Sequence, residues 1–179
     1  MSLDSATELL AYWLIPAEPA RSYFRSLISN LADRFDGPVF EPHVTIYVTE
    51  NTEEQPDTVL GEAFKSYGRY RLSVRGLDHS DKFTKTLFVQ FEPNEELARL
   101  TSDLRRASAV QSDYELNPHL SLIYRTMSRE AKRDLAASIN LPFDEVRFHS
   151  AMAVISPANI KTREDVEAWR VVATQQLCG

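Results

Sequence analysis

The chain has 179 residues, of which 43% are apolar and 26% charged, and its formal net charge is −6 at pH 7. This size and composition are typical of one globular domain, so we expect residues 1–179 to form a single domain. The single cysteine, Cys178, excludes a disulfide framework and a cysteine-ligated zinc site. The acidic balance argues against strong binding of long nucleic acid, which depends on the release of counterions from phosphates.

The sequence shows neither a membrane span nor a secretory signal. No apolar run approaches the roughly 18 residues that a spanning helix requires. Residues 1–4 lack the basic and apolar regions of a signal peptide. We therefore expect a soluble, cytoplasmic protein with no membrane partner, and its size suggests a monomer.

Hydrophobic periodicity predicts alternating strands and helices in the first half of the chain. The expected elements are a strand over 9–15, a helix over 19–35, a strand over 39–48, a helix over 57–67 and strands over 70–77 and 86–91. A polar loop over 78–85 joins the last two strands, and strands joined by a short link usually pair antiparallel.

The second half begins the same order again. The pattern predicts a helix through Leu97, Leu100, Leu104 and Ala107, a strand over 115–124, a helix over 128–139, strands over 143–155 and 169–173, and a polar loop over 156–165.

The two halves carry matching segments that are 76 residues apart. Glu41-Pro42-His43-Val44-Thr45-Ile46-Tyr47 in the first half corresponds to Asn117-Pro118-His119-Leu120-Ser121-Leu122-Ile123 in the second, so that Pro-His falls on Pro-His. An internal repeat of this length predicts a bilobal α+β domain whose halves face each other across a pseudo-twofold axis.

Each matching strand combines one apolar face with one polar face. Residues i and i+2 of a strand point to the same side, so His43 shares a face with Thr45 and His119 shares a face with Ser121. The aliphatic residues between them point to the opposite side. A single strand histidine is more often structural than catalytic, but two in the same pattern at matching points of a repeat favour a functional cleft.

Two imidazoles and two hydroxyls suit one kind of chemistry. A metal site is unsupported, because zinc requires three or four converging ligands, and the chain has no glycine-rich phosphate loop. Two histidines can act as general base and general acid, while hydroxyls hold the non-bridging oxygens of a phosphate. The pattern therefore predicts displacement at a phosphodiester with no metal or other cofactor.

On these motifs the chain resembles the 2H phosphoesterases, which carry two His-x-Thr/Ser-x motifs on a bilobal fold with two antiparallel sheets, flanking helices and a central cleft. The closer resemblance is to the cyclic phosphodiesterase branch known from plants and yeast, through Trp13-Leu14-Ile15-Pro16, the two histidine motifs and Val166-Glu167-Ala168-Trp169. It implies metal-independent hydrolysis of nucleoside 2′,3′-cyclic phosphates to 2′-phosphates, and of ADP-ribose 1″,2″-cyclic phosphate to the 1″-phosphate. The implied partner is a small cyclic-phosphate nucleotide.

The resemblance also implies roles for individual residues. His43 and His119 are the expected acid and base, with His119 favoured as the base for water and His43 as the acid for the leaving oxygen. The hydroxyls are expected to hold the phosphate, and the aromatic residues Tyr124, Phe83 and Trp13 are candidates to border the substrate. Trp13 also fits a core position, because it lies in an apolar strand.

Lys85 departs from the pattern, because a neutral polar residue is expected there. It either favours a more highly charged substrate or is a solvated loop charge, and the second is the commoner case.

Two other functions remain open from the sequence. The first is an RNA-end processing 2H enzyme, acting on 2′-5′ linkages or RNA 3′ ends, which the lack of a basic stripe disfavours. The second is a non-catalytic nucleotide-binding module, which the presence of both histidines disfavours, because such a module is expected to have lost or misplaced one of them. If the motifs served only sheet packing, replacing either histidine would change stability and nothing else.

Overall fold

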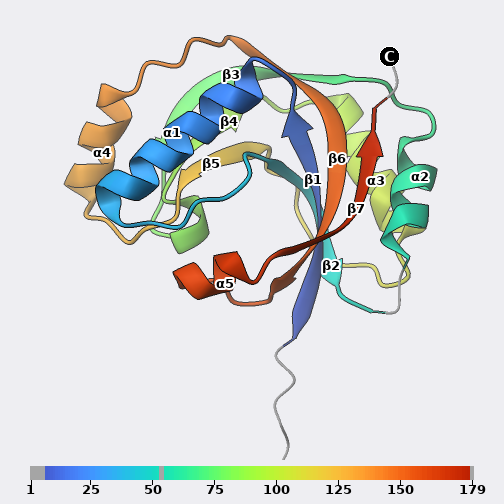
Figure 1. Ribbon diagram of the computed structural model, residues 1–179. Helices are drawn as coiled ribbons and strands as arrows, with labels where there is room; N and C mark the ends of the chain where they lie inside the picture. The colour runs from blue at the N-terminus through green and yellow to red at the C-terminus, as the bar shows by residue number, and fades with distance from the viewer. Residues whose placement is uncertain (1–6, 53–54, 178–179) are drawn as a thin grey trace, which may run out of the picture.

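The computed structural model describes residues 7–52 and 55–177, so Cys178 and residues 1–4 lie outside the described residues. In chain order the elements are β1 (Glu8–Pro16), α1 (Ala20–Phe35), β2 (Val44–Glu50), α2 (Pro56–Phe64), β3 (Tyr70–His79), the short 3-10 helix η1 (Phe83–Lys85), β4 (Leu87–Phe91), α3 (Glu95–Ala107), β5 (His119–Ile123), α4 (Arg129–Ser138), β6 (Glu145–Pro157), α5 (Arg163–Glu167) and β7 (Arg170–Gln176) (Figure 1).

The described strands form one antiparallel sheet that closes on itself. Their order is β1-β2-β5-β4-β3-β6-β7, and β1 also pairs with β6. The α+β class is confirmed. We expected two antiparallel sheets, but the three-stranded groups β6-β1-β2 and β3-β4-β5 are joined through β2–β5 and β3–β6 into one sheet. The expectation of two sheets was wrong, because hydrogen bonding between the groups satisfies edges that would otherwise stay unpaired.

The strand pairing reflects the internal repeat. Val44 and Leu120 occupy equivalent positions of the two halves and pair directly with each other, so the halves meet at this point. When 76 is added to the residue numbers of α1, α2 and β3, the resulting ranges match those of α3, α4 and β6 to within a few residues. The repeat therefore extends further along the chain than the matching histidine segments indicate.

The helices lie outside the closed sheet, and α1 and α3 each pack against the motif strand of the other half. Helix α1 packs against β5, and its counterpart α3 packs against β2. Figure 1 shows α1 and α4 on one side of the sheet and α2 and α3 on the other. Between helices and strands lies a continuous apolar core that includes the fully buried Leu14, Phe24, Leu100 and Phe148. This packing holds the two histidine strands from both sides.

Two predicted strands are shorter than expected at the same place. The strands expected over 39–48 and 115–124 begin only at Val44 and His119. Pro42 and Pro118 precede the two histidines, and a proline has no N–H to donate to a sheet ladder. His43 therefore lies directly before β2, and His119 is the first residue of β5, so both histidines lie where a loop meets a strand.

A short helix, α5, begins within the predicted polar loop 156–165, and the periodicity did not indicate it. The Thr162 hydroxyl accepts from Asp165 N at 3.2 Å, and the Asp165 carboxylate accepts from Thr162 N at 2.9 Å. This capping box stabilises a helix of five residues, which is too short to show an apolar period.

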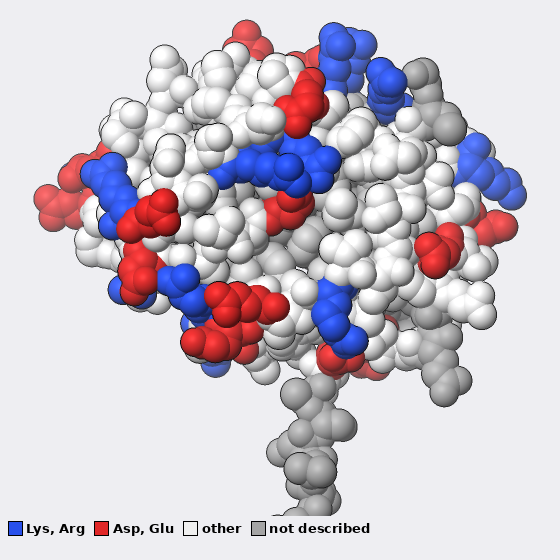
Figure 2. Space-filling model, in the orientation of Figure 1, with Lys and Arg blue, Asp and Glu red and all other residues white. Residues whose placement is uncertain are grey.

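The surface carries both charges close together. On the face shown in Figure 2, Lys and Arg side chains alternate with Asp and Glu side chains. Within the described residues, no helix combines the length and apolar character needed to cross a bilayer.

Candidate active site

The four motif residues converge on one cavity of about 240 Å³ at the junction of β2 and β5. Its lining includes His43 and Thr45 from the first motif and His119 and Ser121 from the second. The alternate residues of both strands point into the core and are fully buried: Val44, Ile46, Leu120 and Leu122. The predicted alternation of faces is therefore confirmed, and direct pairing of Val44 with Leu120 brings the two polar faces together.

Both imidazoles are held in the same way. Nδ1 of His43 lies 2.6 Å from the carbonyl oxygen of Glu41, and Nδ1 of His119 lies 2.7 Å from that of Asn117. Because a carbonyl only accepts hydrogen bonds, Nδ1 is the donor and carries the hydrogen in each ring. Nε2 is then the nitrogen that each histidine offers for proton transfer.

Side chains from neighbouring elements hold the segments that carry these carbonyls. The carboxylate of Glu41 accepts from Arg21 Nε and from Arg25 Nη2 of helix α1, each at 2.7 Å. On the other side, the Asn117 side chain accepts from Gln90 Nε2 of β4 at 2.9 Å. The residue two positions before each histidine is therefore anchored, which orients the imidazole through its backbone partner.

An aromatic ring from the strand opposite a bulge contacts each imidazole. Trp13 of β1 pairs with Thr45 and stacks on His43, with centroids 3.6 Å apart and planes 14° apart, and the register skips Ile46 in β2. Phe88 of β4 pairs with Ser121 and meets His119 edge to face at 5.4 Å, and the register skips Leu122 in β5. Both motif strands therefore carry a bulge at the same place, directly after the hydroxyl residue, and each hydroxyl residue lies opposite an aromatic residue. Trp13 is both a buried residue and part of the cavity wall.

Burial makes both imidazoles harder to protonate. Loss of water around His43 lowers its pKa to about 4, and the positive charge of His119 contributes in the same direction. Burial also lowers the pKa of His119, assisted by the ammonium groups of Lys85 and Lys82. Both rings are therefore neutral in the free protein at pH 7, and a bound anion favours their protonation.

The two hydroxyls differ in their partners. The Ser121 hydroxyl donates to the carbonyl oxygen of Thr84 at 2.8 Å. Thr45 is fixed through its backbone, where its carbonyl accepts from the Tyr114 hydroxyl at 3.1 Å, and its side chain lines the cavity. The Ser121 hydroxyl must turn its hydrogen away from the Thr84 carbonyl in order to donate to a phosphate oxygen. The present hydrogen bond to Thr84 fixes the position of Ser121 Oγ.

The structure brings only one of the two remaining aromatic candidates into the cavity. Tyr124 is buried, lines the cavity and stacks on Phe40 with centroids 4.0 Å apart. Phe83 lies 6.1 Å from Tyr124 but borders a separate cavity of about 90 Å³ that also includes Lys132. Phe83 is not part of the lining of the histidine cavity, and it packs against the cluster that contains Tyr124.

Lys85, for which we weighed a solvated loop charge against a role in substrate preference, is half-buried. Its Nζ lies 4.5 Å above the ring of Phe88, the same ring that contacts His119. Partial burial lowers the pKa of Lys85, with Lys82 acting in the same direction. The ammonium group therefore belongs to the surroundings of His119, although it does not line the cavity.

Sequence reasoning missed Trp169 as a cavity residue. It lies next to β7, far along the chain from both motifs, and its ring centroid is 5.2 Å from that of Trp13 and 5.9 Å from that of His43. Its Nε1 is buried and has no hydrogen-bond partner among the described residues. The segment Val166–Trp169 contributed to the family resemblance, which was the available signal, but no local pattern connects it with the histidines.

The cavity lining supplies few metal ligands. Across residues 7–52 and 55–177, no group of three or more His, Cys, Asp or Glu side chains is placed to hold a metal ion. Two imidazoles without a neighbouring carboxylate fall short of the three or four protein ligands that zinc takes.

Comparison with known proteins agrees with the geometry. The sequence model of the cyclic phosphodiesterase-like protein family matches residues 9–177. A cyclic phosphodiesterase of Arabidopsis thaliana is 22% identical over 174 residues, covering 95% of this chain and 96% of its own. Crystal structures of E. coli LigT with 3′-AMP and of a phosphoesterase share the fold, with TM-scores of 0.60 and 0.61 at 14% identity, covering 97% and 96% of this chain and 99% of each of theirs. The chain belongs to the cyclic phosphodiesterase-like protein family, in the cyclic phosphodiesterase branch of the 2H phosphoesterases.

Proposed function

We propose that this phosphodiesterase hydrolyses nucleoside 2′,3′-cyclic phosphates to 2′-phosphates, or ADP-ribose 1″,2″-cyclic phosphate to the 1″-phosphate, without a metal ion. The observation that carries the proposal is the pair of imidazoles, each bonded through Nδ1 to a carbonyl and each lining the same cavity beside a hydroxyl. This arrangement supplies two proton-transfer groups and two hydrogen-bond donors around one phosphorus atom.

In the proposed reaction, Nε2 of the neutral histidine removes a proton from water as the water oxygen attacks phosphorus. The bond from phosphorus to the 3′ oxygen breaks, and Nε2 of the protonated histidine donates its proton to that oxygen. The hydroxyls of Thr45 and Ser121 bind the non-bridging oxygens. Each turnover exchanges the protonation states of the two histidines, and proton exchange with solvent restores them.

The environments of the two histidines favour one assignment of roles. His43 is the more buried ring, stacks on Trp13 and has a pKa of about 4, so it remains neutral near pH 7. His119 is partly exposed and takes up a proton more readily once a phosphate binds. We therefore assign His43 as the base for water and His119 as the acid, which reverses the assignment expected from the sequence.

The aromatic walls suit the remainder of a small nucleotide. Trp13, Tyr114, Tyr124 and Trp169 border the cavity together with the two histidines. Aromatic rings stack with nucleobases or pack on a ribose at little entropic cost. E. coli LigT, which shares this fold, has been solved with 3′-AMP, which supports a small nucleotide as the ligand.

The reaction is tested with 2′,3′-cyclic AMP and ADP-ribose 1″,2″-cyclic phosphate in excess EDTA, with products identified by phosphorus NMR. We expect a 2′-phosphate or a 1″-phosphate, and a loss of at least about 100-fold in kcat in His43→Asn and His119→Asn. Asparagine keeps an N–H that can reach the Glu41 or Asn117 carbonyl. Failure of the folded protein to cleave either compound refutes the proposal and directs the test to RNA with cyclic or 2′-5′ ends.

The assignment of acid and base has its own test. A 2′,3′-cyclic substrate with sulfur in place of the 3′ oxygen has a leaving group of low pKa, which departs without a proton. We expect this substrate to restore most of the activity lost in His119→Asn and little of that lost in His43→Asn. The opposite pattern would return His119 to the role of base.

A further inference from the structure

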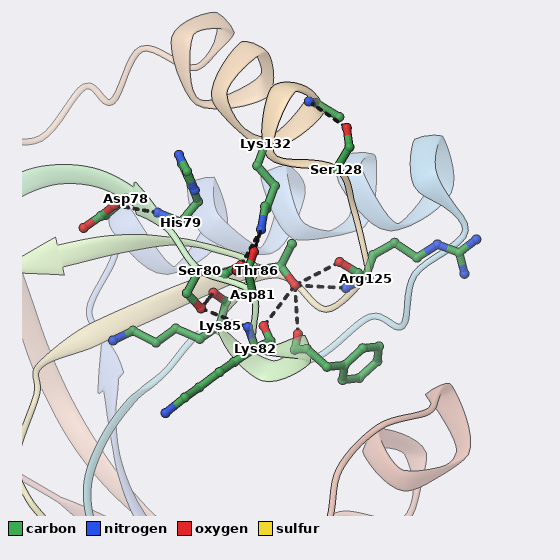
Figure 3. Close-up of polar contacts among 12 residues, drawn as sticks. Asp78, His79, Ser80, Asp81, Lys82, Lys85, Thr86, Arg125, Ser128 and Lys132 are labelled. Carbon is green, nitrogen blue, oxygen red and sulfur yellow. Dashed lines mark hydrogen bonds and ion pairs between the residues drawn. The ribbon is translucent and has the colours of Figure 1, made fainter.

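Lys132 of helix α4 is a lysine buried against the segment that leads into η1. Its side chain is only 2% exposed. Nζ donates to the carbonyl oxygen of Ser80 and to Oδ1 of Asp81, each at 2.7 Å, while the Asp81 side chain is 87% exposed (Figure 3). Burying an ammonium group is costly unless its hydrogens are bonded. The equivalent position of the other half is Pro56, so only one lobe has this feature.

The residues that Lys132 binds organise the whole segment 80–86. The Ser80 backbone N–H donates to the Thr86 carbonyl at 3.2 Å, and the Ser80 hydroxyl donates to the Lys85 carbonyl at 2.5 Å. The Lys82 N–H donates back to the Ser80 hydroxyl at 3.2 Å. Figure 3 shows the Lys132 side chain reaching this network, with the Lys82 and Lys85 side chains extending away from it. Lys132 therefore holds Ser80, whose hydrogen bonds to Lys85 and Thr86 close the loop.

The same segment ends at the active site. The carbonyl of Thr84, in the middle of η1, accepts the hydrogen bond that orients the Ser121 hydroxyl. The ammonium of Lys85 lies above Phe88, whose ring edge contacts His119. A displacement of the loop therefore changes both the orientation of the Ser121 hydroxyl and the position of the Lys85 ammonium group near His119.

We propose that Lys132 is a positioning residue for catalysis, acting by fixing the loop 80–85 so that Thr84 orients Ser121 and the loop ammonium groups stay close to His119. The kinetic part of this inference rests on the proposed function. Lys132 contacts neither the cavity nor a reacting atom, and its effect passes through Ser80 and Asp81.

The charged and titratable groups around His119 determine what release of the loop changes. Lys85 and Lys82 of the loop act on its charge, His43 lies in the same cavity directly before β2, and Tyr114 and Tyr124 also line this cavity. Only the two loop lysines depend on Lys132 for their position. Because they lower the pKa of His119, a loosened loop raises it.

The test is Lys132→Met, which replaces a buried charge by an apolar side chain of similar length and removes the donor from the Ser80 carbonyl and from the exposed Asp81 carboxylate. Arg133→Met is the matched control, because Arg133 is the next residue of the same helix and its side chain is 73% exposed. Two quantities are measured on the folded proteins: the NMR titration of His119 without substrate, and kcat and KM with the cyclic substrate.

We expect a higher His119 pKa and a kcat/KM lowered by about 10- to 100-fold in Lys132→Met, with Arg133→Met like the wild type. An unchanged His119 titration in folded Lys132→Met overturns the inference whether or not the proposed reaction is observed. If Lys132→Met does not fold, Asp81→Asn removes the exposed end of the contact, and its His119 pKa must rise for the inference to stand. A protein inactive toward the cyclic substrates but with the shifted titration refutes only the proposed function.

Discussion

The burial of His43 predicts how stability depends on pH. An unfolded chain binds a proton at this histidine with a pKa near its ordinary value of 6.5, whereas the folded protein binds it only near pH 4. Between these values the unfolded state carries one more proton than the folded state, so acidification favours unfolding. The contribution of His43 is fully present above pH 6.5 and is lost as the pH falls toward 4.

The expected magnitude follows from the difference between the two pKa values. Each pKa unit corresponds to roughly 1.4 kcal/mol, so lowering the pH from 7 to 5 should cost about 2 kcal/mol of unfolding free energy through this one group. Because His43 is nearly inaccessible to water, solvent screening does not reduce this figure. Other groups also titrate, so the informative quantity is the difference between wild type and His43→Asn.

The assay is urea unfolding, monitored by circular dichroism, at several pH values between 7 and 5. We expect the wild type to lose about 2 kcal/mol more than His43→Asn over this interval, whatever the offset between them at pH 7. His79→Gln is the control, because it removes a histidine of the 78–85 region outside the cavity. Parallel curves for wild type and His43→Asn would refute the reasoning and place a protonated His43 in the folded state.

The cavity residues lead to two kinetic predictions and one prediction of a pKa shift. His119→Asn should retain its fold and lose at least about 100-fold in kcat. EDTA should not change the activity of the wild type, and inhibition by EDTA would point to a bound metal. Thr45→Ala and Ser121→Ala should each lower kcat/KM by roughly tenfold, since a hydrogen bond to a charged group contributes about 1.5–3 kcal/mol, and unchanged initial rates would remove that residue from phosphate binding. Trp13→Leu should raise the pKa of His43 by admitting water to its ring face, which an NMR titration measures; an unshifted titration would show that other neighbours keep the ring dry.

Much of the fold followed from local patterns in the chain. The period of two in the motif strands correctly predicted that Val44 and Leu120 point to the core while the histidines point away from it. The strand boundaries were less accurate, because the prolines before each histidine interrupt the ladder in a stretch that otherwise has strand composition. Helix α5 escaped prediction because a capping box, rather than an apolar period, stabilises it.

The composition of the candidate site was only partly visible. Spacing identified four polar residues that share the cavity, but the contribution of Trp169 depends on how β7 runs beside β6. For Phe83, an aromatic ring in a polar loop predicted a substrate contact, and in the structure the ring lies near Tyr124 and borders the smaller cavity. Loop conformation depends on distant partners such as Lys132, which the loop sequence does not contain.

The amino-acid sequence by itself determined the repeat, the two His-x-Thr/Ser patterns and the face of the strand on which each side chain lies, because these follow from backbone geometry over a few residues. Only the tertiary structure decided that Val44 pairs with Leu120, that Trp13 stacks on His43 and that burial lowers the pKa of that histidine. These properties depend on contacts between residues far apart in the chain, which closure of the sheet brings together.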